Sequence, residues 1–587
     1  MPRFLPNACE ITFHPGSTLM SPLISIENLS IQFGDPKTNA PAVDDLTLRI
    51  GTGEFLALVG ESGSGKSVTA LSLLQLLPKT SNLYPNGKIQ YYPNQEQPID
   101  LIRLTPAEWS SIRGSKISMI FQEPMTALNP LVRCGEQIAE VMRRHKKMDA
   151  RMARSEAIKW IERVQIPNPQ LMYDRFPHQL SGGQKQRILI AAALCCGPDL
   201  LICDEPTTAL DVTVQKEILE LIRNEQQKMG MAVLFISHDL ALVSQYANRV
   251  AVMYQGKLVE EGASPHIFQQ PNHPYTRALL ACRPAAHRKG DRLPMVRDFL
   301  ESFDKPPATI AHQSASKAPQ PTLFRAERLS IRYPGPKNWL GRSRPSPMVV
   351  QEASFEIKQG EVLGLVGESG SGKSTLGRAV LGMIKPCSGS MWHQDQDLLK
   401  LNPAQWPLRR KQLQLIFQDP YSSLNPRMPI GEAIGEALRV HRLVDTRLKE
   451  KEKEKVMEWL QRVQLKAEHY NRYPHEFSGG QRQRIVIARA LALEPEFVVC
   501  DESVSALDVS VQAQVLNLLN DLRKELNFTT LFISHDLGVV RYLCDRLLVL
   551  KNGQIVESGE AEQVCSRPEH PYTQNLLQAI PQLKSVP

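Results

Sequence analysis

An eight-residue pattern that could bind phosphate occurs twice in the chain. Residues 60–67 and residues 367–374 both read GESGSGKS, which fits the pattern G-x-x-x-x-G-K-[ST]. Glycines let the backbone curl so that successive N–H groups point at phosphate oxygens, and the following helix adds its dipole. The lysine would reach the outer phosphates and the next hydroxyl would bind Mg²⁺. These residues are Lys66 and Ser67 in the first copy and Lys373 and Ser374 in the second.

Adjacent carboxylates end two apolar runs further along the chain. Residues 199–205 read DLLICDE and residues 496–502 read EFVVCDE. The first acid of each pair can hold Mg²⁺ through water, and the second can polarise an attacking water. A purely structural role is disfavoured, because burying adjacent acids without a cation is costly. The pairs are Asp204 with Glu205 and Asp501 with Glu502.

A glutamine and a histidine recur at strand ends in both copies. Gln122 and Gln418 follow apolar runs and could offer an amide oxygen to a metal or a water, although such a residue alone is more often part of a surface loop. His238 and His535 also end apolar runs. A lone histidine is usually structural, but one beside a triphosphate can bond the γ-phosphate.

A second device for phosphate binding opens two helical stretches. Residues 180–187 read LSGGQKQR and residues 477–484 read FSGGQRQR, each before an apolar helical pattern. Ser-Gly-Gly at a helix start exposes backbone N–H groups and the helix dipole without side-chain obstruction. An ordinary helix N-cap with glycines has the same spacing and remains the alternative.

The elements around these motifs are those of an open α/β sheet. Short apolar runs at 54–60 and 361–367 precede the phosphate loops, as buried parallel strands do, and stretches compatible with helices follow at 68–77 and 375–384. Acids at the carboxyl ends of such strands lie where these sheets bind their ligands.

Two alternating stretches, residues 23–33 and 323–333, predict edge strands. Each ends in an aromatic residue, Phe33 or Tyr333, that could stack on an adenine ring. An ordinary aromatic at a strand end is the alternative.

Length and composition are those of a soluble globular protein. The chain has 587 residues, 42% apolar and 22% charged, and a net charge of +8. We see no apolar run near the roughly 20 residues of a membrane span, and no compact apolar stretch typical of a signal peptide. The ten cysteines form no C-x-x-C pair, which predicts reduced, mostly buried thiols. The charge gives weak support for a role at a membrane surface.

Equivalent residues of the two copies lie about 300 positions apart, which indicates tandem duplication of a domain. Between the copies, residues 283–322 contain Pro-Pro, Ser-Ala-Ser and Pro-Gln-Pro segments, which predict a flexible, partly extended linker. A stretch rich in Pro, Gly and Arg, residues 334–347, predicts a loop.

With these motifs in place, the chain resembles two ATPase domains of ABC transporters fused in tandem, over residues 23–581 apart from the linker. Seven motifs of that family occur in order in each half: A-loop, Walker A, Q-loop, LSGGQ signature, Walker B, D-loop (ending at Asp211 and Asp508) and H-loop. A closer resemblance, to ATPases of oligopeptide, dipeptide and nickel importers, is carried by FQEPMTALNP, FQDPYSSLNP, HPYTRALL and HPYTQNLL. The fusion resembles the ATP-binding subunits of glutathione-type or microcin-type importers.

The resemblance implies an α/β fold with two tandem ABC-type P-loop NTPase domains. Each would have a RecA-like α/β core, an antiparallel β subdomain and a helical subdomain. The boundaries expected are a disordered extension at 1–22, the first domain at 23–282, the linker at 283–322 and the second domain at 323–587.

The resemblance also implies site residues. Residues expected to contact ATP are Phe33, Gly60, Glu61, Ser62, Gly63, Ser64, Gly65, Lys66, Ser67, Val68, Gln122, Ser181, Gly182, Gly183, Gln184, Asp211, Tyr333, Gly367, Glu368, Ser369, Gly370, Ser371, Gly372, Lys373, Ser374, Thr375, Gln418, Ser478, Gly479, Gly480, Gln481 and Asp508. Expected catalytic residues are Glu205, Glu502, His238 and His535, and expected Mg²⁺ ligands are Ser67, Gln122, Asp204, Ser374, Gln418 and Asp501.

By the same resemblance, the halves pack head to tail as an intramolecular pseudo-dimer and sandwich two ATP molecules. The partners implied are two transmembrane permease subunits, contacted through residues 123–131 and 419–427, and indirectly a substrate-binding protein. The chain would lie peripherally on the cytoplasmic face of the bacterial inner membrane and take up peptides or a similar small solute, without binding nucleic acid. Two alternatives are a soluble tandem ATPase acting on ribosomes or nucleic acid, and an ATP-binding scaffold with little hydrolysis.

Departures from the family pattern are few. The proline after the first acidic pair, Pro206, is Ser503 in the second half, and the second signature begins with Phe477 instead of leucine. Relatives with a cysteine-rich tail after HPYT bind an iron–sulfur cluster. Here Cys282 and Cys565 stand alone, so no cluster is expected.

Overall fold

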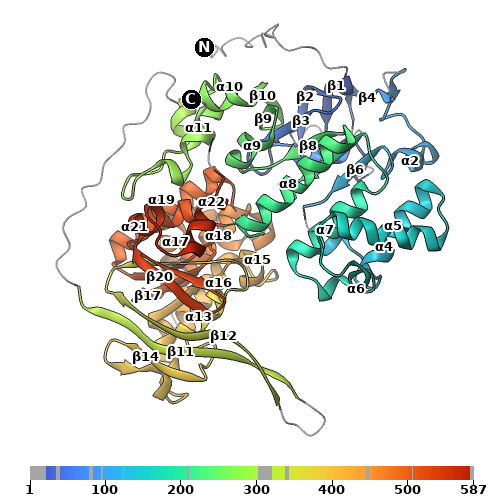
Figure 1. Ribbon diagram of the computed structural model, residues 1–587. Helices are drawn as coiled ribbons and strands as arrows, with labels where there is room; N and C mark the ends of the chain where they lie inside the picture. Colours follow the sequence, from blue (N-terminus) through green and yellow to red (C-terminus); the bar gives the residue numbers. More distant parts are fainter. Residues whose placement is uncertain are drawn as a thin grey trace, which may run out of the picture.

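The chain forms two halves of similar architecture, shown in blue to green and in yellow to red in Figure 1. The structure is a computed structural model that describes residues 22–34, 40–78, 84–93, 97–122, 124–207, 210–301, 320–337, 343–444, 449–505, 507–581 and 583. Each half has a six-stranded sheet, a four-stranded sheet and a set of helices. The predicted N-terminal extension lies outside the described residues except for Pro22, which begins the first strand.

The large sheet of the first half is mostly parallel. Its strands are β3 (Phe55–Val59), β6 (Ile117–Ile120), β7 (Leu200–Asp204), β8 (Ala232–Ile236), β9 (Arg249–Tyr254) and β10 (Lys257–Ala263). They lie in the order β10-β9-β3-β8-β7-β6, with β10 antiparallel to β9. Every residue of β3, β7 and β8 is buried, as expected of strands covered on both faces. Their carboxyl ends meet at one edge of the sheet and carry the predicted site.

The small sheet of the first half is antiparallel. Its strands are β1 (Pro22–Ile31), β2 (Val43–Gly51), β4 (Asn86–Tyr91) and β5 (Ile99–Asp100), in the order β2-β1-β4-β5. The prediction that residues 23–33 form an edge strand is wrong, because β1 lies between β2 and β4. Alternation reports which side chains face the core and says nothing about neighbours in the hydrogen-bonding direction.

Helices complete the first half. They are α1 (Lys66–Ser72), α2 (Pro106–Ile112), α3 (Pro124–Ala127), α4 (Cys134–Lys146), α5 (Ala150–Arg163), α6 (Pro169–Tyr173), α7 (Gly182–Leu194), α8 (Val212–Met229), α9 (Leu240–Tyr246), α10 (Ser264–Gln269) and α11 (Pro274–Ala281), with a 3-10 turn η2 (Pro177–Gln179). Helices α4 to α7 pack on one another and form a separate helical layer (Figure 1).

The second half repeats this plan. Its strands are β11 (Thr322–Lys337), β12 (Ser343–Lys358), β13 (Val362–Val366), β14 (Ser388–His393), β15 (Gln396–Asp397), β16 (Leu413–Ile416), β17 (Phe497–Asp501), β18 (Thr529–Ile533), β19 (Arg546–Lys551) and β20 (Gln554–Glu560). The sheet orders are β16-β17-β18-β13-β19-β20 and β12-β11-β14-β15. Here too the predicted edge strand is wrong, because β11 lies between β12 and β14.

Its helices are α13 (Lys373–Val380), α14 (Trp406–Gln412), α15 (Pro420–Ser423), α16 (Ile430–Val440), α17 (Lys449–Arg462), α18 (Gly479–Leu491), α19 (Val509–Leu526), α20 (Leu537–Leu543), α21 (Ala561–Ser566) and α22 (Pro571–Ala579), with 3-10 turns η4 (Leu398–Lys400), η5 (Ala467–Asn471) and η6 (Pro474–Glu476). Strands β11 and β12 form a long hairpin that projects from the body (Figure 1). They run into the stretch predicted to be a loop, on both sides of residues 338–342.

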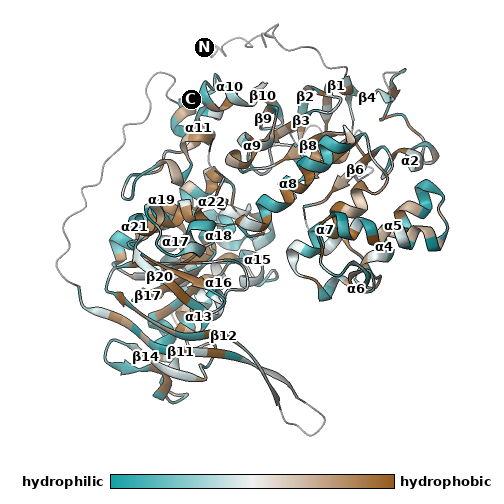
Figure 2. Cartoon of the chain, in the orientation of Figure 1, coloured by the Kyte–Doolittle hydropathy of each residue, from teal (hydrophilic) through white to brown (hydrophobic). Residues whose placement is uncertain are grey.

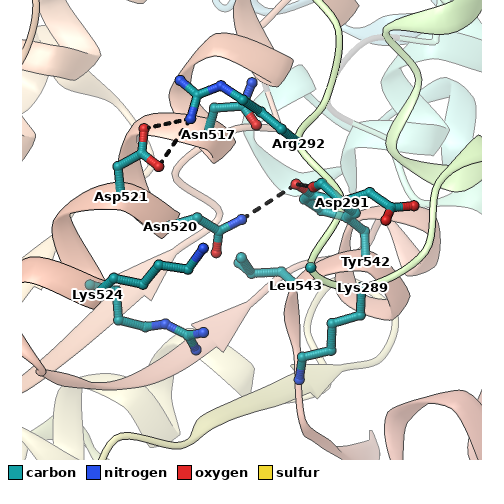
Figure 3. A pocket seen from close by; sticks show the side chains of 11 residues that line it. Lys289, Asp291, Arg292, Asn517, Asn520, Asp521, Lys524, Tyr542 and Leu543 are labelled. Carbon is teal, nitrogen blue, oxygen red and sulfur yellow. Dashed lines mark hydrogen bonds and ion pairs between the residues drawn. The ribbon is translucent and has the colours of Figure 1, made fainter. Parts of the chain in front are cut away.

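The segment after α11 folds onto the second half, so its prediction as a flexible linker is wrong for residues 284–301. It contains the turn η3 (Pro284–Ala286) and α12 (Val296–Glu301). We call residues 287–301 the strap. The side chain of Asn517 bonds both the N–H and the C=O of Leu293, at 3.0 and 2.8 Å, and Arg292 pairs with Asp521 (Figure 3). Leu293 is 1% exposed, and burial of its side chain helps to offset the entropy lost in ordering the strap.

Apolar residues concentrate along the strands of the large sheets, while helices such as α8 carry both polar and apolar faces (Figure 2). One cluster of buried side chains continues from the first half through Leu293 and Val296 into the second. No helix among the described residues is long and apolar enough to cross a membrane.

Candidate ATP sites

The phosphate loops follow the central strands β3 and β13 of the large sheets. A Cβ on Gly60 would lie 2.2 Å from the carbonyl oxygen of Met253, so only glycine fits there. The N-cap of α1 is Gly65 with φ of 101°, a left-handed conformation that favours glycine. The second loop repeats both features: a Cβ on Gly367 would lie 2.1 Å from the carbonyl oxygen of Leu550, and Gly372 has φ of 104°. The loops therefore have the tight curl predicted for phosphate binding.

The loop lysines lie buried at the start of α1 and α13. Lys66 donates to the carbonyls of Gly60 and Glu61, at 2.8 and 2.7 Å, and Lys373 makes the same two bonds in its own loop. Burial lowers the pKa of both lysines, partly offset by nearby carboxylates. Both hydroxyls of the buried loop serines, Ser64 and Ser371, have no hydrogen-bond partner in the described part of the chain. These groups fit a site whose natural partner is a phosphate.

Two of the three residues expected to hold Mg²⁺ in each site, the serine and the aspartate, are in contact. Ser67 donates to Asp204 at 3.0 Å, and Ser374 donates to Asp501 at 2.8 Å. Burial raises the pKa of both aspartates, while the serine hydroxyls and loop lysines favour the ionised form. A hydroxyl and a buried carboxylate in contact beside a phosphate loop fit the way Mg²⁺ is held, by few protein ligands together with substrate phosphates.

The predicted catalytic glutamates meet the predicted glutamines and histidines. Gln122 donates its amide to Glu205 at 3.0 Å, and His238 Nδ1 lies 3.3 Å from the same carboxylate. Glu205 has φ of 46° and its N–H bonds the carbonyl of Ile236, so the strained backbone is held by the neighbouring strand. The second half repeats this arrangement, with Gln418 at 2.8 Å and His535 at 3.3 Å from Glu502, whose φ is also 46°.

Electrostatics couple each histidine to its glutamate. Burial lowers the pKa of His238, but the carboxylate of Glu205, together with the charges of Asp508 and Asp239, more than offsets this, so the pKa is raised above its usual value. His535 behaves in the same way beside Glu502. Burial raises the pKa of Glu502, but the bond from His535 and the charge of Lys373 bring it below its usual value. Glu502 is therefore ionised at neutral pH and can accept a hydrogen bond from a water.

Each phosphate loop also contacts the opposite half. The N–H of Ser62 donates to Asp508 of the second half at 2.8 Å, and the N–H of Ser369 donates to Asp211 of the first half. These aspartates are the N-caps of α19 and α8. Thr213 of α8 also donates to Glu368, at 3.3 Å. The two D-loop aspartates therefore join the halves at both sites.

The signature motifs open α7 and α18. Ser181 and Gln184 form a reciprocal capping box, and Ser478 and Gln481 form the same box. The ordinary helix N-cap, which the sequence left open as an alternative, is therefore present in both signature motifs.

The glycines of the signature motifs differ in how much space surrounds them. A Cβ on Gly183 would lie 2.8 Å from Val214, and one on Gly480 would lie 2.1 Å from Val511, whereas a Cβ on Gly479 would meet no described atom within 4 Å.

The predicted adenine-stacking aromatics differ in exposure. Phe33 is half-buried against the core beneath the small sheet. Tyr333 is exposed, and its hydroxyl lies 3.0 Å from that of Thr375, the residue after the loop serine. Val68, the equivalent of Thr375, also packs on the core. Tyr333 therefore lies beside the residue that follows its phosphate loop, while Phe33 and Val68 pack against the same core of the first half.

Two tyrosines that the sequence motifs did not single out touch the phosphate loops. Tyr275 accepts a hydrogen bond from the N–H of Glu61 at 3.0 Å, and Tyr572 accepts one from the N–H of Glu368 at 3.1 Å. Both belong to the repeated HPYT segment, which in the sequence served only to support the family resemblance. The recurrence of this segment in both halves was the signal that could have pointed to the two tyrosines.

The two residues that depart from the motif pattern, Ser503 and Phe477, are both buried. Ser503 is 2% exposed, and Phe477 packs edge-on against His469 with ring centroids 5.2 Å apart. Among the described residues, neither side chain is hydrogen-bonded to a phosphate loop.

Together, two phosphate loops with paired acids, contacted by D-loops from the opposite half, define a P-loop ATPase of the ABC class. The family described as "ABC transporter" matches residues 43–208 and 350–505. The family described as "Oligopeptide/dipeptide transporter, C-terminal region" matches residues 259–308 and 556–586. The chain belongs to the ABC transporter family and carries two ATP-binding cassettes, as predicted, and it is an ATPase that binds ATP.

Individual relatives are similar over nearly the whole chain. The chain is 45% identical over 561 residues to the glutathione import ATP-binding protein GsiA of Pectobacterium atrosepticum, and 46% identical over 565 residues to the protein of that name from Escherichia coli strain K12. Each comparison covers 95% of this chain and 89% of the relative. A solved dimeric ATP-binding cassette in a post-hydrolysis state, bound to ADP and Pi, is 26% identical, with a TM-score of 0.37 over 41% of this chain and 98% of that one.

Proposed function

We propose that this protein is the ATP-hydrolysing motor of an importer that takes up short peptides or a similar small solute. The observation that carries the proposal is the duplicated site in which each phosphate loop meets the D-loop aspartate of the opposite half. Similarity to glutathione import proteins over 95% of the chain supports the direction of transport and the class of solute. In this proposal the two halves act as an intramolecular pseudo-dimer.

Each ATP would be bound between one half's phosphate loop and the other half's signature helix. Lys66 and Ser67 would face Ser478, Gly479 and Gly480, and the second site would be formed by Lys373, Ser374, Ser181, Gly182 and Gly183. The open space at Gly479 and the dipole of α18 suit the approach of a phosphate. Phe33 and Tyr333 would contact the adenine rings.

Mg²⁺ would be held by Ser67, Asp204 and Gln122 in one site and by Ser374, Asp501 and Gln418 in the other. When bound, it neutralises charge on the outer phosphates of ATP. Each glutamine donates a hydrogen bond from its amide nitrogen to the neighbouring glutamate. Its amide oxygen therefore points away from that carboxylate and can serve as a metal ligand.

Glu205 and Glu502 would each orient and polarise the attacking water, and His238 and His535 would bond the γ-phosphate. Since each histidine pairs with its glutamate, a γ-phosphate would compete with that glutamate for the imidazole. Loss of the γ-phosphate would restore the pair. This exchange gives the site a local signal for hydrolysis.

The proposed permease contacts lie beside the Q-loops. In the second half a cleft is lined by the end of α15, by side chains of α16 and α18, and by the segment between α15 and α16. Its lining residues are Ser422, Ser423, Leu424, Asn425, Pro426, Met428, Ala433, Glu436 and Arg489. Two large apolar side chains are exposed in these regions, Tyr421 at 60% and Leu131 at 85%. We propose that a cytoplasmic helix of each of two permease subunits binds there, with a substrate-binding protein acting from the far side. The chain would then lie on the cytoplasmic face of the bacterial inner membrane.

The test is affinity capture of the tagged chain from detergent-solubilised native membranes, followed by reconstitution of the captured complex. We expect two multi-spanning proteins in equal amount, and ATP-dependent uptake of glutathione or short peptides by the proteoliposomes. Capture with ribosomes or nucleic acid, and no multi-spanning partner, would favour the soluble alternative and overturn the proposal.

A further inference from the structure

The HPYT segments place a tyrosine hydroxyl on the backbone of each phosphate loop. We propose that Tyr275 and Tyr572 are positioning residues of the two ATP sites. Each would hold the second residue of its phosphate loop in place, so that the loop lysine and the D-loop contact keep their geometry. The proposal concerns ATP binding by this family of ATPases and does not depend on the solute transported.

The HPYT sequence explains how the tyrosine is aimed. His273 is the N-cap of α11 and its ring accepts a bond from the N–H of Tyr275 at 3.2 Å, while Pro274 begins the helix. The carboxylate of Glu260 accepts from the N–H of His273 at 3.2 Å and ties this turn to β10. In the second half, His570, Pro571 and Glu557 take the same roles.

The tyrosine rings are clamped, so the hydroxyls have little freedom. Tyr275 is fully buried, with its ring centroid 4.2 Å from that of Tyr254. Tyr572 is also buried, and the ammonium of Lys551 lies 4.8 Å from its ring centroid. Burial raises the pKa of both phenols, which keeps them neutral. A neutral hydroxyl on a fixed ring is a rigid acceptor for one backbone N–H.

The anchored peptide links three parts of the site. The N–H of Glu61 is bonded to Tyr275 and its carbonyl to Lys66. The next N–H, that of Ser62, is bonded to Asp508 of the other half. A change in the orientation of Glu61 would therefore displace both the lysine and the contact between halves.

The second site has the same connections, made by independent residues. Glu368 bonds Tyr572 through its N–H and Lys373 through its carbonyl, and Ser369 bonds Asp211. Here α22, which carries the tyrosine, also contacts α8, whose N-cap is that aspartate. Two occurrences of one geometry, produced by two different segments of sequence, argue against an incidental contact.

The proposal is tested with Tyr275→Phe, Tyr572→Phe and the double variant, which keep the ring and remove the hydroxyl. A tyrosine that positions the loop but touches no reacting atom affects ground state and transition state alike, which raises KM and leaves kcat unchanged. Loss of one net hydrogen bond of about 1 kcal/mol predicts a KM for ATP raised roughly fivefold at the affected site. Direct binding of a fluorescent ATP analogue should weaken by a similar factor.

Tyr254→Phe is the matched control, because Tyr254 packs on Tyr275 while its hydroxyl accepts from Gln255 instead of the loop. This variant should leave KM unchanged. Thermal stability of every variant is measured alongside. A double variant with a lowered melting temperature and an unchanged KM and ATP affinity would show a purely structural role and overturn the proposal. A fall in kcat at unchanged KM would overturn it as well.

Discussion

The carboxylate of Asp508, at the start of α19 in the second half, accepts a hydrogen bond from the backbone N–H of Ser62 in the first phosphate loop, at 2.8 Å. Asp211 makes the equivalent bond to Ser369. Sites that each require both halves should fail together when these contacts are lost.

We therefore expect the double variant Asp211→Ala and Asp508→Ala to lower kcat/KM for ATP at least tenfold, since a hydrogen bond to a charged acceptor contributes about 1.5–3 kcal/mol. The measurement is steady-state ATPase activity. Asp→Asn at both positions is the matched control, because it retains an acceptor oxygen and should lose less. Equal activity of the Ala variant and the wild type would rule out a role for these contacts.

The histidine–glutamate pairs predict a pH dependence of stability. Because the pKa of His238 and of His535 is raised in the folded protein, their stabilisation is present below the ordinary histidine pKa of about 6.5 and is lost as the pH rises through the raised value. We expect the pairs to contribute about 1 kcal/mol each to the free energy of unfolding of the nucleotide-free protein. As this contribution is lost over the stated pH range, the melting temperature should fall.

Differential scanning fluorimetry between pH 6 and pH 9 measures this component. The double variant His238→Gln and His535→Gln should lack it, because glutamine does not titrate. If the variant and the wild type lose stability in parallel across the range, the pairs are not its source.

The strap should stabilise the association of the two halves. Asn517 is buried and bonds both backbone groups of Leu293, so Asn517→Ala leaves buried polar groups unpaired and should cost about 2 kcal/mol. Urea unfolding provides the measurement, and Arg297→Ala, at an exposed residue of α12, is the control with no expected effect beyond about 0.5 kcal/mol. Equal losses for the two variants would contradict a specific role for the strap.

The proposed permease contacts predict uncoupling without loss of basal activity. Leu131→Glu and Tyr421→Glu place a charge on exposed apolar side chains next to the Q-loops, and should abolish solute uptake in proteoliposomes while ATP hydrolysis by the isolated protein continues. Leu408→Glu is the control. It lies on α14, before β16, whereas Tyr421 follows the other end of that strand. Uptake that survives both substitutions would place the permease contact elsewhere.

The sequence predicted correctly that these short motifs lie at the carboxyl ends of strands. The loop around Lys66 follows β3, and Asp204 and Glu205 lie at the carboxyl end of β7. Parallel strands bring these ends to the same edge of the sheet. Pairings such as Gln122 with Glu205 could be anticipated from this edge alone, although their distances could not.

Contacts between distant parts of the chain could not be predicted in the same way. Tyr275 lies 214 residues from Glu61 in the chain, and no local sequence pattern predicts that a hydroxyl on α11 will contact a phosphate loop. The prediction of a flexible linker was wrong for the strap, because composition does not show that two of its apolar residues, Leu293 and Val296, pack against the second half. Likewise the alternation in β1 is that of a half-exposed strand, but it does not indicate which strands pair with β1 on either side.

The central claim is that both sites hydrolyse ATP through Glu205 and Glu502. The most direct test compares kcat for the wild type, the two single Glu→Gln variants and the double variant, with ATP binding measured on each. General-base catalysis contributes about 10²- to 10⁴-fold, so the double variant should lose at least a hundredfold in kcat while still binding ATP, and each single variant should lose at least half. A double variant that hydrolyses ATP at the wild-type rate would contradict the account.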